Sequence, residues 1–395
     1  MDFDLHDSTI LVGVAGSRAY GLHTDTSDVD LKGVCLPPRP YHLTFRKRFD
    51  QCDKPGQMEP FRKYLDAEQM DAAEREKLEG VVYGLGKFMK LTADCNPGML
   101  DVLFCRDEEL LMHNWAGQLL REHRDLFLSG AAKHRFTGYA FQQLKRIKGH
   151  RAWLLNPPTH KPTREEFGLG EEVVTQHQRN VLLAAIDKQL DEWKWDFGEM
   201  ADSEKIRAKD NIAETLATIG VTTDDELWIA AARSIGIDEG LLEALKGEKR
   251  YKDAQKNWKS FETWKRQRNP KRAALEAASG YDTKHGAHLV RLLRMGREIL
   301  TTGKVHVWRG GIDREELLAI RKGAWTYDEL VDWADRENAA LGDIYTSYYG
   351  AEKQRVTARV KKGLEPLPKL TPVLPYSPDM DKLDDLYVRI VESVL

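Results

Sequence analysis

The chain has 395 residues, a length that predicts two or three domains rather than one hydrophobic core. Charged residues make up 31% and apolar residues 41%, which excludes a disordered or fibrous protein, and the net charge of -3 favours no class of partner. No stretch approaches the roughly 20 apolar residues of a membrane span, and acidic residues stand where a signal peptide carries basic ones. We therefore expect a cytoplasmic protein.

Several common enzyme and metal motifs are absent from the sequence. The four cysteines form no CxxC pair and have no histidines at zinc-finger spacing, so we expect free thiols. No HExxH, Walker-type or GxSxG motif occurs, which excludes the corresponding hydrolases and ATPases.

The N-terminal elements alternate between strand and helix. The apolar run 10–15 predicts a strand that ends in a tight turn and a short helix at Gly16-Ser17-Arg18. Residues 29–36 predict a second strand, which Pro37-Pro38 ends. The charged segment 66–79 is interpreted as a solvated helix or an insertion.

Two further elements complete this region. Apolar residues recur at helical spacing over 81–92, and Asn96-Pro97-Gly98 breaks the pattern before 99–104, a short strand candidate. The order indicates an α+β protein, with a small mixed-sheet domain over residues 1–125 followed by a mostly helical C-terminal region.

The rest of the chain has a helical pattern. The helix candidates are 136–147, 173–195, 283–300, 314–322 and 327–341, with Gly303 and Gly323 at C-terminal capping positions. The proline-rich segment 364–378 predicts an extended connector before a last helix over 379–395. The domain boundaries expected after residue 125 are a helical region 126–200, a charged, basic and aromatic helical insertion 201–275, and a C-terminal helical region 276–395.

Asp28 and Asp30 carry the clearest chemical signal. Two aspartates at i and i+2 of a strand project from the same face, so their carboxylates can share a pair of divalent cations, and hard oxygen ligands suit Mg²⁺ or Mn²⁺. Gly16 lets the backbone approach a phosphate closely, and the Ser17 hydroxyl can donate a hydrogen bond to a triphosphate. An isolated DxD is usually solvated charge; the order and spacing of the two motifs is far less common.

These motifs resemble the signature of the DNA polymerase beta superfamily of nucleotidyltransferases. More narrowly, GSRAYGLHTDTSDVDLKGV is similar to the predicted nucleotidyltransferases of the RNA repair pathway DNA polymerase beta family. The helix containing Lys87, then Asn96-Pro97 and an acidic residue at Asp101, resemble that family's helix, break and third acidic strand. The segments 138–140, 284–291 and 320–323 resemble its C-terminal landmarks.

The resemblance implies roles for individual residues. Asp28, Asp30 and Asp101 would hold two metal ions, with Asp101 nearest the acceptor hydroxyl, although the family usually has glutamate at the third position. Gly16 and Ser17, with Arg18 beside them, would hold the triphosphate. Two roles are open for Lys87: a phosphate contact or surface charge. Residues 50–80 and 200–275 are longer than the family needs and are interpreted as insertions.

Each of two basic segments has two interpretations, one purely structural and one in binding. Lys284, His288 and Arg291 share one helix face, which is either solvated or placed over the nucleotide or the acceptor's phosphates; His285 is a weaker candidate. Residues 246–272 contain eleven basic residues against three acidic ones, interleaved with aromatic residues. Their helical periodicity favours packing on a core, while the charges can still face nucleic acid.

The expected reaction is metal-dependent transfer of a nucleoside monophosphate from an NTP to a hydroxyl, with release of pyrophosphate. RNA or another nucleic acid is the favoured acceptor. The alternatives are a protein hydroxyl, as in AMPylation, and a catalytically silent binding module. Two adjacent carboxylates without a metal would repel each other, which argues against the silent module.

Overall fold

The computed structural model describes residues 2–24, 27–75, 78–170, 239–268 and 270–395, with a few single positions between 181 and 236. The chain forms two compact units: residues 1–155 with 269–395, and residues 156–268. The predicted α+β class is confirmed, because a small mixed sheet near the N-terminus precedes a mostly helical region.

A mixed five-stranded sheet with the order β3-β4-β2-β1-β5 forms the centre of the N-terminal part. The strands are β1 (Thr9–Ala15), β2 (Asp30–Cys35), β3 (Gln51–Cys52), β4 (Glu79–Gly84) and β5 (Leu110–His113). β2 and β4 are parallel, while β1 pairs antiparallel with β2 and β5. Asp30 is opposite both Ala15 and Glu79, so the end of β1 and the starts of β2 and β4 meet at one end of the sheet.

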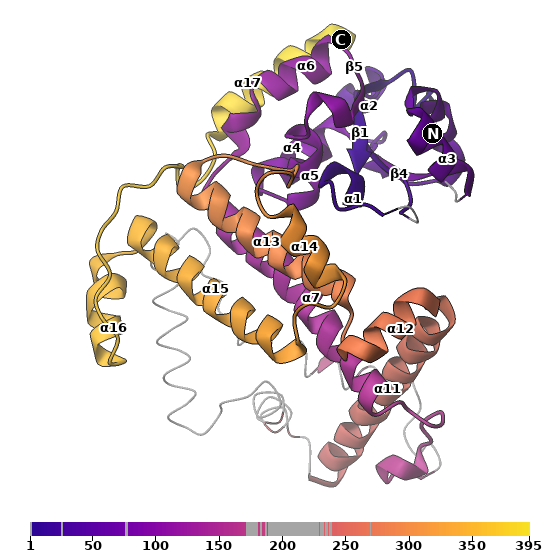
Figure 1. The fold of residues 1–395 in the computed structure, drawn as a ribbon, viewed down its shortest axis with the longest axis vertical. Helices are drawn as coiled ribbons and strands as arrows, with labels where there is room; N and C mark the ends of the chain where they lie inside the picture. Colours follow the sequence, from indigo (N-terminus) through magenta and orange to yellow (C-terminus); the bar gives the residue numbers. More distant parts are fainter. Residues whose placement is uncertain are drawn as a thin grey trace. The chain divides into compact units, whose positions relative to one another are not determined.

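The two faces of the sheet have separate cores. On one face lie four helices, α4 (Leu85–Ala93), α5 (Pro97–Leu103), α6 (Trp115–Glu122) and α17 (Met380–Val391) (Figure 1). On the other face lies α3 (Ala67–Arg75) with its neighbouring loops. Val34 is in the core under the four helices, and side chains alternate along a strand, so Asp30 and Lys32 share this helix-covered face.

Two local predictions are wrong. Residues 81–84 are part of β4 rather than a helix, which begins only at Leu85. Gly80 permits this pairing, because a Cβ there would lie 2.8 Å from the Leu31 carbonyl oxygen. Residues 99–103 form helix α5 and not a strand. Asn96 caps this helix through the Gly98 amide and Pro97 occupies its first turn, so the predicted break is a helix start.

The helical predictions after residue 125 are confirmed wherever the structure describes them. α7 (Ala131–Leu155) and α13 (Thr283–Thr302) lie side by side, with α14 (Arg314–Arg321) and α15 (Tyr327–Tyr349) packed on α13 (Figure 1). Gly303 caps α13 in the left-handed conformation, and Gly323, also with positive φ, follows α14. The candidate helix 173–195 lies outside the described residues.

The last helix returns to the N-terminal sheet. Residues 364–378 contain no helix or strand, as predicted, and Asp379 then caps α17 through the Lys382 amide. Leu383, Leu386 and Ile390 of α17 are buried in the same core as α4 and α5. The chain's last helix therefore completes the N-terminal domain. The remaining short helices of this unit are α1 (Gly16–Ala19), α2 (Pro40–Leu43), α12 (Pro270–Ser279) and α16 (Ala358–Lys361).

The second unit contains the long helix α11 (Glu239–Gln267). Phe261 is buried at 5% exposure and contacts the Trp258 and Trp264 rings, at centroid distances of 6.0 and 5.9 Å. The packing interpretation of this basic and aromatic segment is therefore confirmed for Phe261. All four cysteines are free, as predicted, and the structure buries all four. Among the described residues, no helix has the length and apolarity needed to span a membrane.

Candidate active site

Gly16 forms the turn at which β1 ends, and it lies against Asp30, the first residue of β2. Its φ of +64° is in the left-handed region that favours glycine. A Cβ at this position would lie 2.4 Å from the Asp30 Oδ2 atom. The Gly16-Ser17 turn is thus directly beside the carboxylate of Asp30, as the spacing predicts. The Ser17 hydroxyl has no hydrogen bond within the described residues and is partly exposed.

Replacing Gly16 with alanine should reduce the melting temperature and should lower the nucleotide transfer that the sequence resemblance implies at least about tenfold. The left-handed conformation costs an alanine about 1–2 kcal/mol, and its methyl group would displace the Asp30 carboxylate. Transfer assays and thermal unfolding measure both effects. Gly86→Ala is the matched control, because its Cβ would meet nothing closer than 3.7 Å. Full activity in Gly16→Ala would contradict the close approach.

Three carboxylates gather at this end of the sheet. Asp28 immediately precedes β2, and Asp30 opens it; both are partly buried. Burial raises the pKa of Asp30. The negative charge of Asp28 raises this pKa further, and that of Glu79 has a smaller effect in the same direction. Glu79 opens β4 directly opposite Asp30, with an exposed side chain. Neighbouring strands are about 4.8 Å apart and paired residues share a face, so Glu79 is the third acidic group here.

This arrangement fits divalent cations. Burial and the neighbouring charges of Asp28 and Glu79 disfavour the ionised form of Asp30, which raises its pKa. Oxygen donors of this kind are the ligands of Mg²⁺ and Mn²⁺, and cations among them would offset that repulsion.

Sequence reasoning missed Glu79. The charged segment 66–79 predicts a solvated helix or an insertion, although Glu79 directly precedes Gly80 and the β-branched pair Val81-Val82. That pattern is typical of a strand start and is the sequence signal for Glu79.

Two lysines place positive charge next to the carboxylates. The charges of Lys284, on α13, and of Lys32, on β2, both lower the pKa of Asp30 against the effects of burial and Asp28. Lys32 Nζ also donates to the Gly98 carbonyl oxygen at 3.4 Å. The sequence indicated Lys284 but not Lys32, whose position two residues after Asp30 puts it on the same strand face.

Arg18 is bound within the protein rather than directed at a phosphate site. Its guanidinium donates to the carbonyl oxygens of Ser27 and Asp28, at 3.5 and 3.3 Å, and to Glu68 of α3 at 2.9 Å. It is 7% exposed. Arg18 therefore braces the loop that carries Asp28, and the structure does not support its predicted contact with the nucleotide.

Asp101 is buried on helix α5 and is not on a strand. It is 3% exposed and accepts a hydrogen bond from the Tyr20 hydroxyl. Its other oxygen is 4.0 Å from Arg291 Nη1, and the Arg291 guanidinium stacks on the Tyr20 ring at 3.5 Å. Burial, first of all, raises the pKa of Tyr20, so its hydroxyl keeps its proton. Tyr20, Asp101 and Arg291 thus tie α1, α5 and α13 together.

His288 is one turn beyond Lys284 on α13, with its ring edge to face on Tyr20 at 6.5 Å. Burial lowers its pKa well below the usual value, and the charges of Arg291 and Lys284 lower it further, so the imidazole is neutral. Of the predicted basic face, Lys284 acts on Asp30, His288 packs against Tyr20, and Arg291 is buried with Asp101. His285 is directed elsewhere, and its Nδ1 atom is 2.8 Å from Gln143 Oε1.

Lys87 is not near this group. It lies on α4 after the far end of β4, roughly 16 Å along the sheet from the pair Asp30 and Glu79, given about 3.3 Å per residue. Its ammonium donates to Gln51 Oε1 at 2.9 Å and is 3.8 Å from Asp50. Of its two interpretations, the position favours surface charge.

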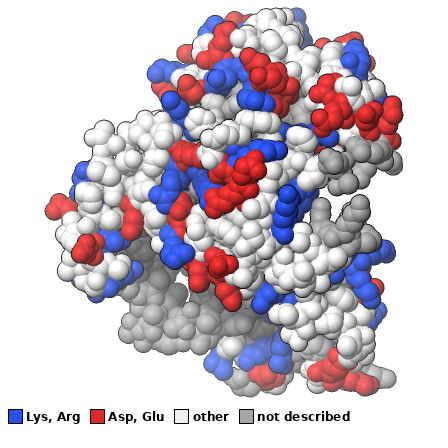
Figure 2. All heavy atoms as spheres, viewed as in Figure 1, with Lys and Arg blue, Asp and Glu red and all other residues white. Residues whose placement is uncertain are grey.

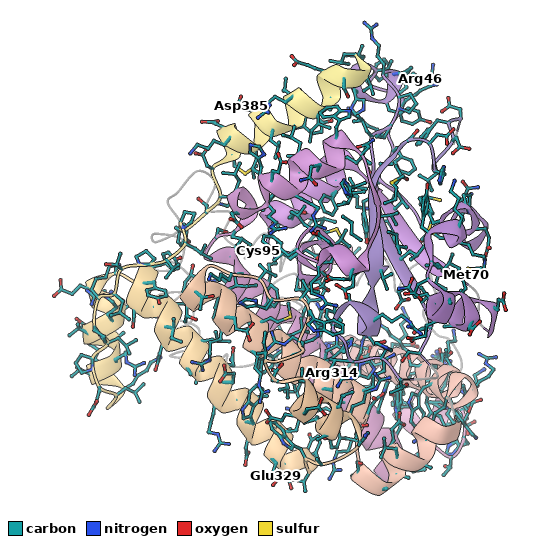
Figure 3. All side chains as sticks on the ribbon, turned by 45° about the horizontal axis from the view of Figure 1, so that its top comes forward. Arg46, Met70, Cys95, Arg314, Glu329 and Asp385 are labelled. Carbon is teal, nitrogen blue, oxygen red and sulfur yellow. The ribbon has the colours of Figure 1, made fainter. Side chains whose placement is uncertain are left out.

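The C-terminal helices hold the loop that follows the Gly16-Ser17 turn. Arg314 donates to the Gly21 carbonyl oxygen at 2.7 Å, Arg321 donates to that of Leu22, and the Arg309 amide donates to that of Tyr20 at 3.1 Å. Figure 3 shows Arg314 on α14 where that helix reaches the N-terminal domain. These helices are therefore part of the frame of the site, a role that no local sequence pattern indicates.

The N-terminal part of the chain is similar to a known family. Residues 4–154 match the model of the RNA repair pathway DNA polymerase beta family, which confirms the resemblance seen in the sequence. The matched range includes the Gly16-Ser17 turn and all the carboxylates described above. Neither the curated proteins nor the solved structures compared with the chain gave a match.

Proposed function

Since residues 4–154 are similar to polymerase-beta-like nucleotidyltransferases, we propose that the protein transfers a nucleoside monophosphate from an NTP to a hydroxyl acceptor, with Mg²⁺ or Mn²⁺ held by Asp28, Asp30 and Glu79. The observation that carries this proposal is the meeting of these carboxylates with Gly16 at one end of the sheet. Glu79 takes the third position, for which the sequence suggested Asp101; glutamate is also the residue type that the resemblance implies there.

When bound, two such cations lower the pKa of an attacking hydroxyl and stabilise the charge of departing pyrophosphate. Gly16 lets the backbone approach the triphosphate closely, and the Ser17 hydroxyl donates a hydrogen bond to it. Lys32 and Lys284 offset phosphate charge beside Asp30. The acceptor oxygen bonds to the α-phosphorus as the bond to the bridging oxygen breaks, and the acceptor's proton passes to solvent.

We assign Asp101 a positioning role. Through Tyr20 it holds the segment that follows Ser17, and Arg291 extends this hold to the helix carrying Lys284 and His288.

RNA is the proposed acceptor, on the strength of the family description and the basic character of α11. On the face drawn in Figure 2, positive and negative side chains are interspersed, in keeping with the net charge of -3. Recognition of a polyanion would therefore depend on local basic groups such as those of α11.

The decisive experiment is incubation with each labelled NTP, Mg²⁺ or Mn²⁺, and either total RNA or lysate protein. Label in RNA supports the proposal. Label in protein would replace RNA with a protein hydroxyl as acceptor, and label in neither, with NTP binding retained, would indicate a silent binding module.

Neutralising four exposed basic residues of α11 should weaken RNA binding and flatten its salt dependence. Single-stranded binding loses about 0.7 units of log-log slope per phosphate contact removed. The positions for substitution by glutamine are Lys256, Lys259, Lys265 and Arg266. Binding isotherms at several salt concentrations measure the slope, and a matched control variant changes four exposed lysines elsewhere: Lys353, Lys361, Lys362 and Lys369. Equal slopes in both variants would mean that the α11 charges face only solvent.

A further inference from the structure

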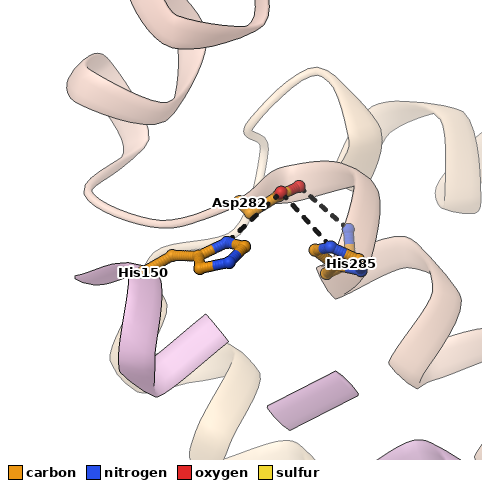
Figure 4. A group of neighbouring side chains, drawn as sticks. All are labelled: His150, Asp282 and His285. Atoms are coloured by element: carbon orange, nitrogen blue, oxygen red, sulfur yellow. Dashed lines mark hydrogen bonds and ion pairs between the residues drawn. The ribbon is translucent and has the colours of Figure 1, made fainter. Parts of the chain in front are cut away.

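A second group of possible metal ligands lies away from the carboxylates. His150 of α7, Asp282 at the N-cap of α13, and His285 one turn into α13 converge, with one ligand atom from each lying within 4.8 Å of the others (Figure 4). Asp282 Oδ2 is 3.5 Å from His285 Nε2 and 3.8 Å from His150 Nδ1. The Asp282 side chain is only 4% exposed.

The hydrogen bonds of this group determine which atoms face its centre. His285 Nδ1 is 2.8 Å from the amide oxygen of Gln143, which can only accept, so Nδ1 carries the ring proton. His285 Nε2 therefore presents a lone pair to Asp282 Oδ2. The lone pair of Nε2 and the Asp282 carboxylate oxygen thus face each other at 3.5 Å, an arrangement that a cation between them would stabilise.

We propose that His150, Asp282 and His285 bind one transition-metal ion of the Zn²⁺ class. Ligand atoms at about 2.0–2.1 Å from a tetrahedral ion are roughly 3.4 Å apart, close to the two separations from Asp282. Imidazole donors select Zn²⁺ and its neighbours over Mg²⁺. The bond from His285 Nδ1 to Gln143 is the outer contact that metal-binding histidines usually make.

A second histidine and carboxylate group, formed by Asp4, His6 and Asp7, lacks these properties. His6 Nδ1 is 3.1 Å from Asp7, and its Nε2 is 3.1 Å from the Tyr64 hydroxyl, so both ring nitrogens are engaged.

The ion would connect α7 to the first turn of α13. Lys284, whose charge acts on Asp30, lies in that turn between two of the ligands. The ion would therefore fix the position of the helix that carries Lys284 and His288, and it would take no part in the chemical step.

The test measures metal binding by the full chain. After removal of metals with a chelator, Zn²⁺ is titrated in competition with a chromophoric chelator, and Co²⁺ is used as a spectroscopic probe. We expect one tight Zn²⁺ per chain and visible Co²⁺ absorption typical of low coordination number. His150→Ala and His285→Ala should weaken Zn²⁺ binding by about a hundredfold or more, beyond the 10–100-fold typical of outer contacts.

Control variants make the result specific. Asp282→Asn keeps an acceptor for the His285 amide, and therefore the helix cap, while removing the ligand charge, so it should fold and bind Zn²⁺ weakly. His160→Ala, which replaces an exposed histidine of the second unit, should leave Zn²⁺ affinity unchanged. No tight Zn²⁺ binding by the wild type, or wild-type Zn²⁺ affinity in Asp282→Asn and His150→Ala, would overturn the proposal. Because binding is measured without NTP, the outcome is independent of the transferase proposal.

Discussion

Replacing Asp30 with asparagine is expected to reduce the rate of nucleotide transfer by at least about a thousandfold. The substitution keeps the size of the side chain but removes the charge that lies between Asp28 and Glu79. Losing about 4 kcal/mol of transition-state stabilisation corresponds to this factor, and a carboxylate shared by two cations supplies an effect of that size. Single-turnover assays with saturating NTP and Mg²⁺ measure it.

The same variant should be more stable than the wild type when no metal is present. The folded protein raises the pKa of Asp30 above 3.8, so the ionised carboxylate costs folding free energy at neutral pH. Asparagine removes that cost. The difference should shrink as the pH falls through the raised pKa and vanish below about 3.8, where Asp30 is protonated in both states.

Lys87→Met is the matched control for this experiment, because Lys87 lies at the opposite end of β4 and contacts Gln51. Its transfer rate and KM for NTP should match those of the wild type. Wild-type turnover in Asp30→Asn would remove the two-cation proposal. A loss of turnover accompanied by unfolding would instead indicate a structural role for the carboxylate.

Glu79→Gln and Asp101→Asn are expected to have opposite consequences. Glu79 is exposed beside Asp30, so its amide variant should fold normally and lose at least about a hundredfold in transfer rate. Asp101 is buried between Tyr20 and Arg291, so its amide variant should lose about 1–3 kcal/mol of stability because the Arg291 charge loses its neighbour. Transfer by the folded fraction should fall less than tenfold.

Denaturant unfolding and transfer assays on both variants separate the two roles. Glu109→Gln is a useful reference, since Glu109 is a buried carboxylate of the same sheet region that is bound to Arg106. It should affect stability without a specific effect on turnover. If Asp101→Asn folded normally and lost a hundredfold in rate while Glu79→Gln remained active, Asp101 would be the third ligand, as the sequence first suggested.

A truncated protein that lacks the C-terminal helices would lose contacts that hold the candidate site together. Arg309, Arg314 and Arg321 bind the backbone of residues 20–22, and α17 fills the core beneath α4. Residues 1–125 alone would expose that core and release the loop after Ser17. A fragment of this length is therefore unsuitable for testing the carboxylates, and every variant should be made in the full chain.

Features that depend on neighbours along the chain follow from the sequence alone. Gly16 and Ser17 follow β1, Asp28 and Asp30 stand two residues apart where β2 begins, and α13, α14 and α15 show in their periodicity, because turns and helical spacing are local. Which groups from distant segments meet is a property of the tertiary structure. Glu79 reaches Asp30 through strand pairing, and Asp101 meets Tyr20 and Arg291 because α5 packs against α13 and the end of α1. The apolar run around Asp101 is buried, so it has no period that distinguishes strand from helix. His150 and Asp282 meet because α7 packs along α13, and such packing follows from burial of apolar surface over the whole unit.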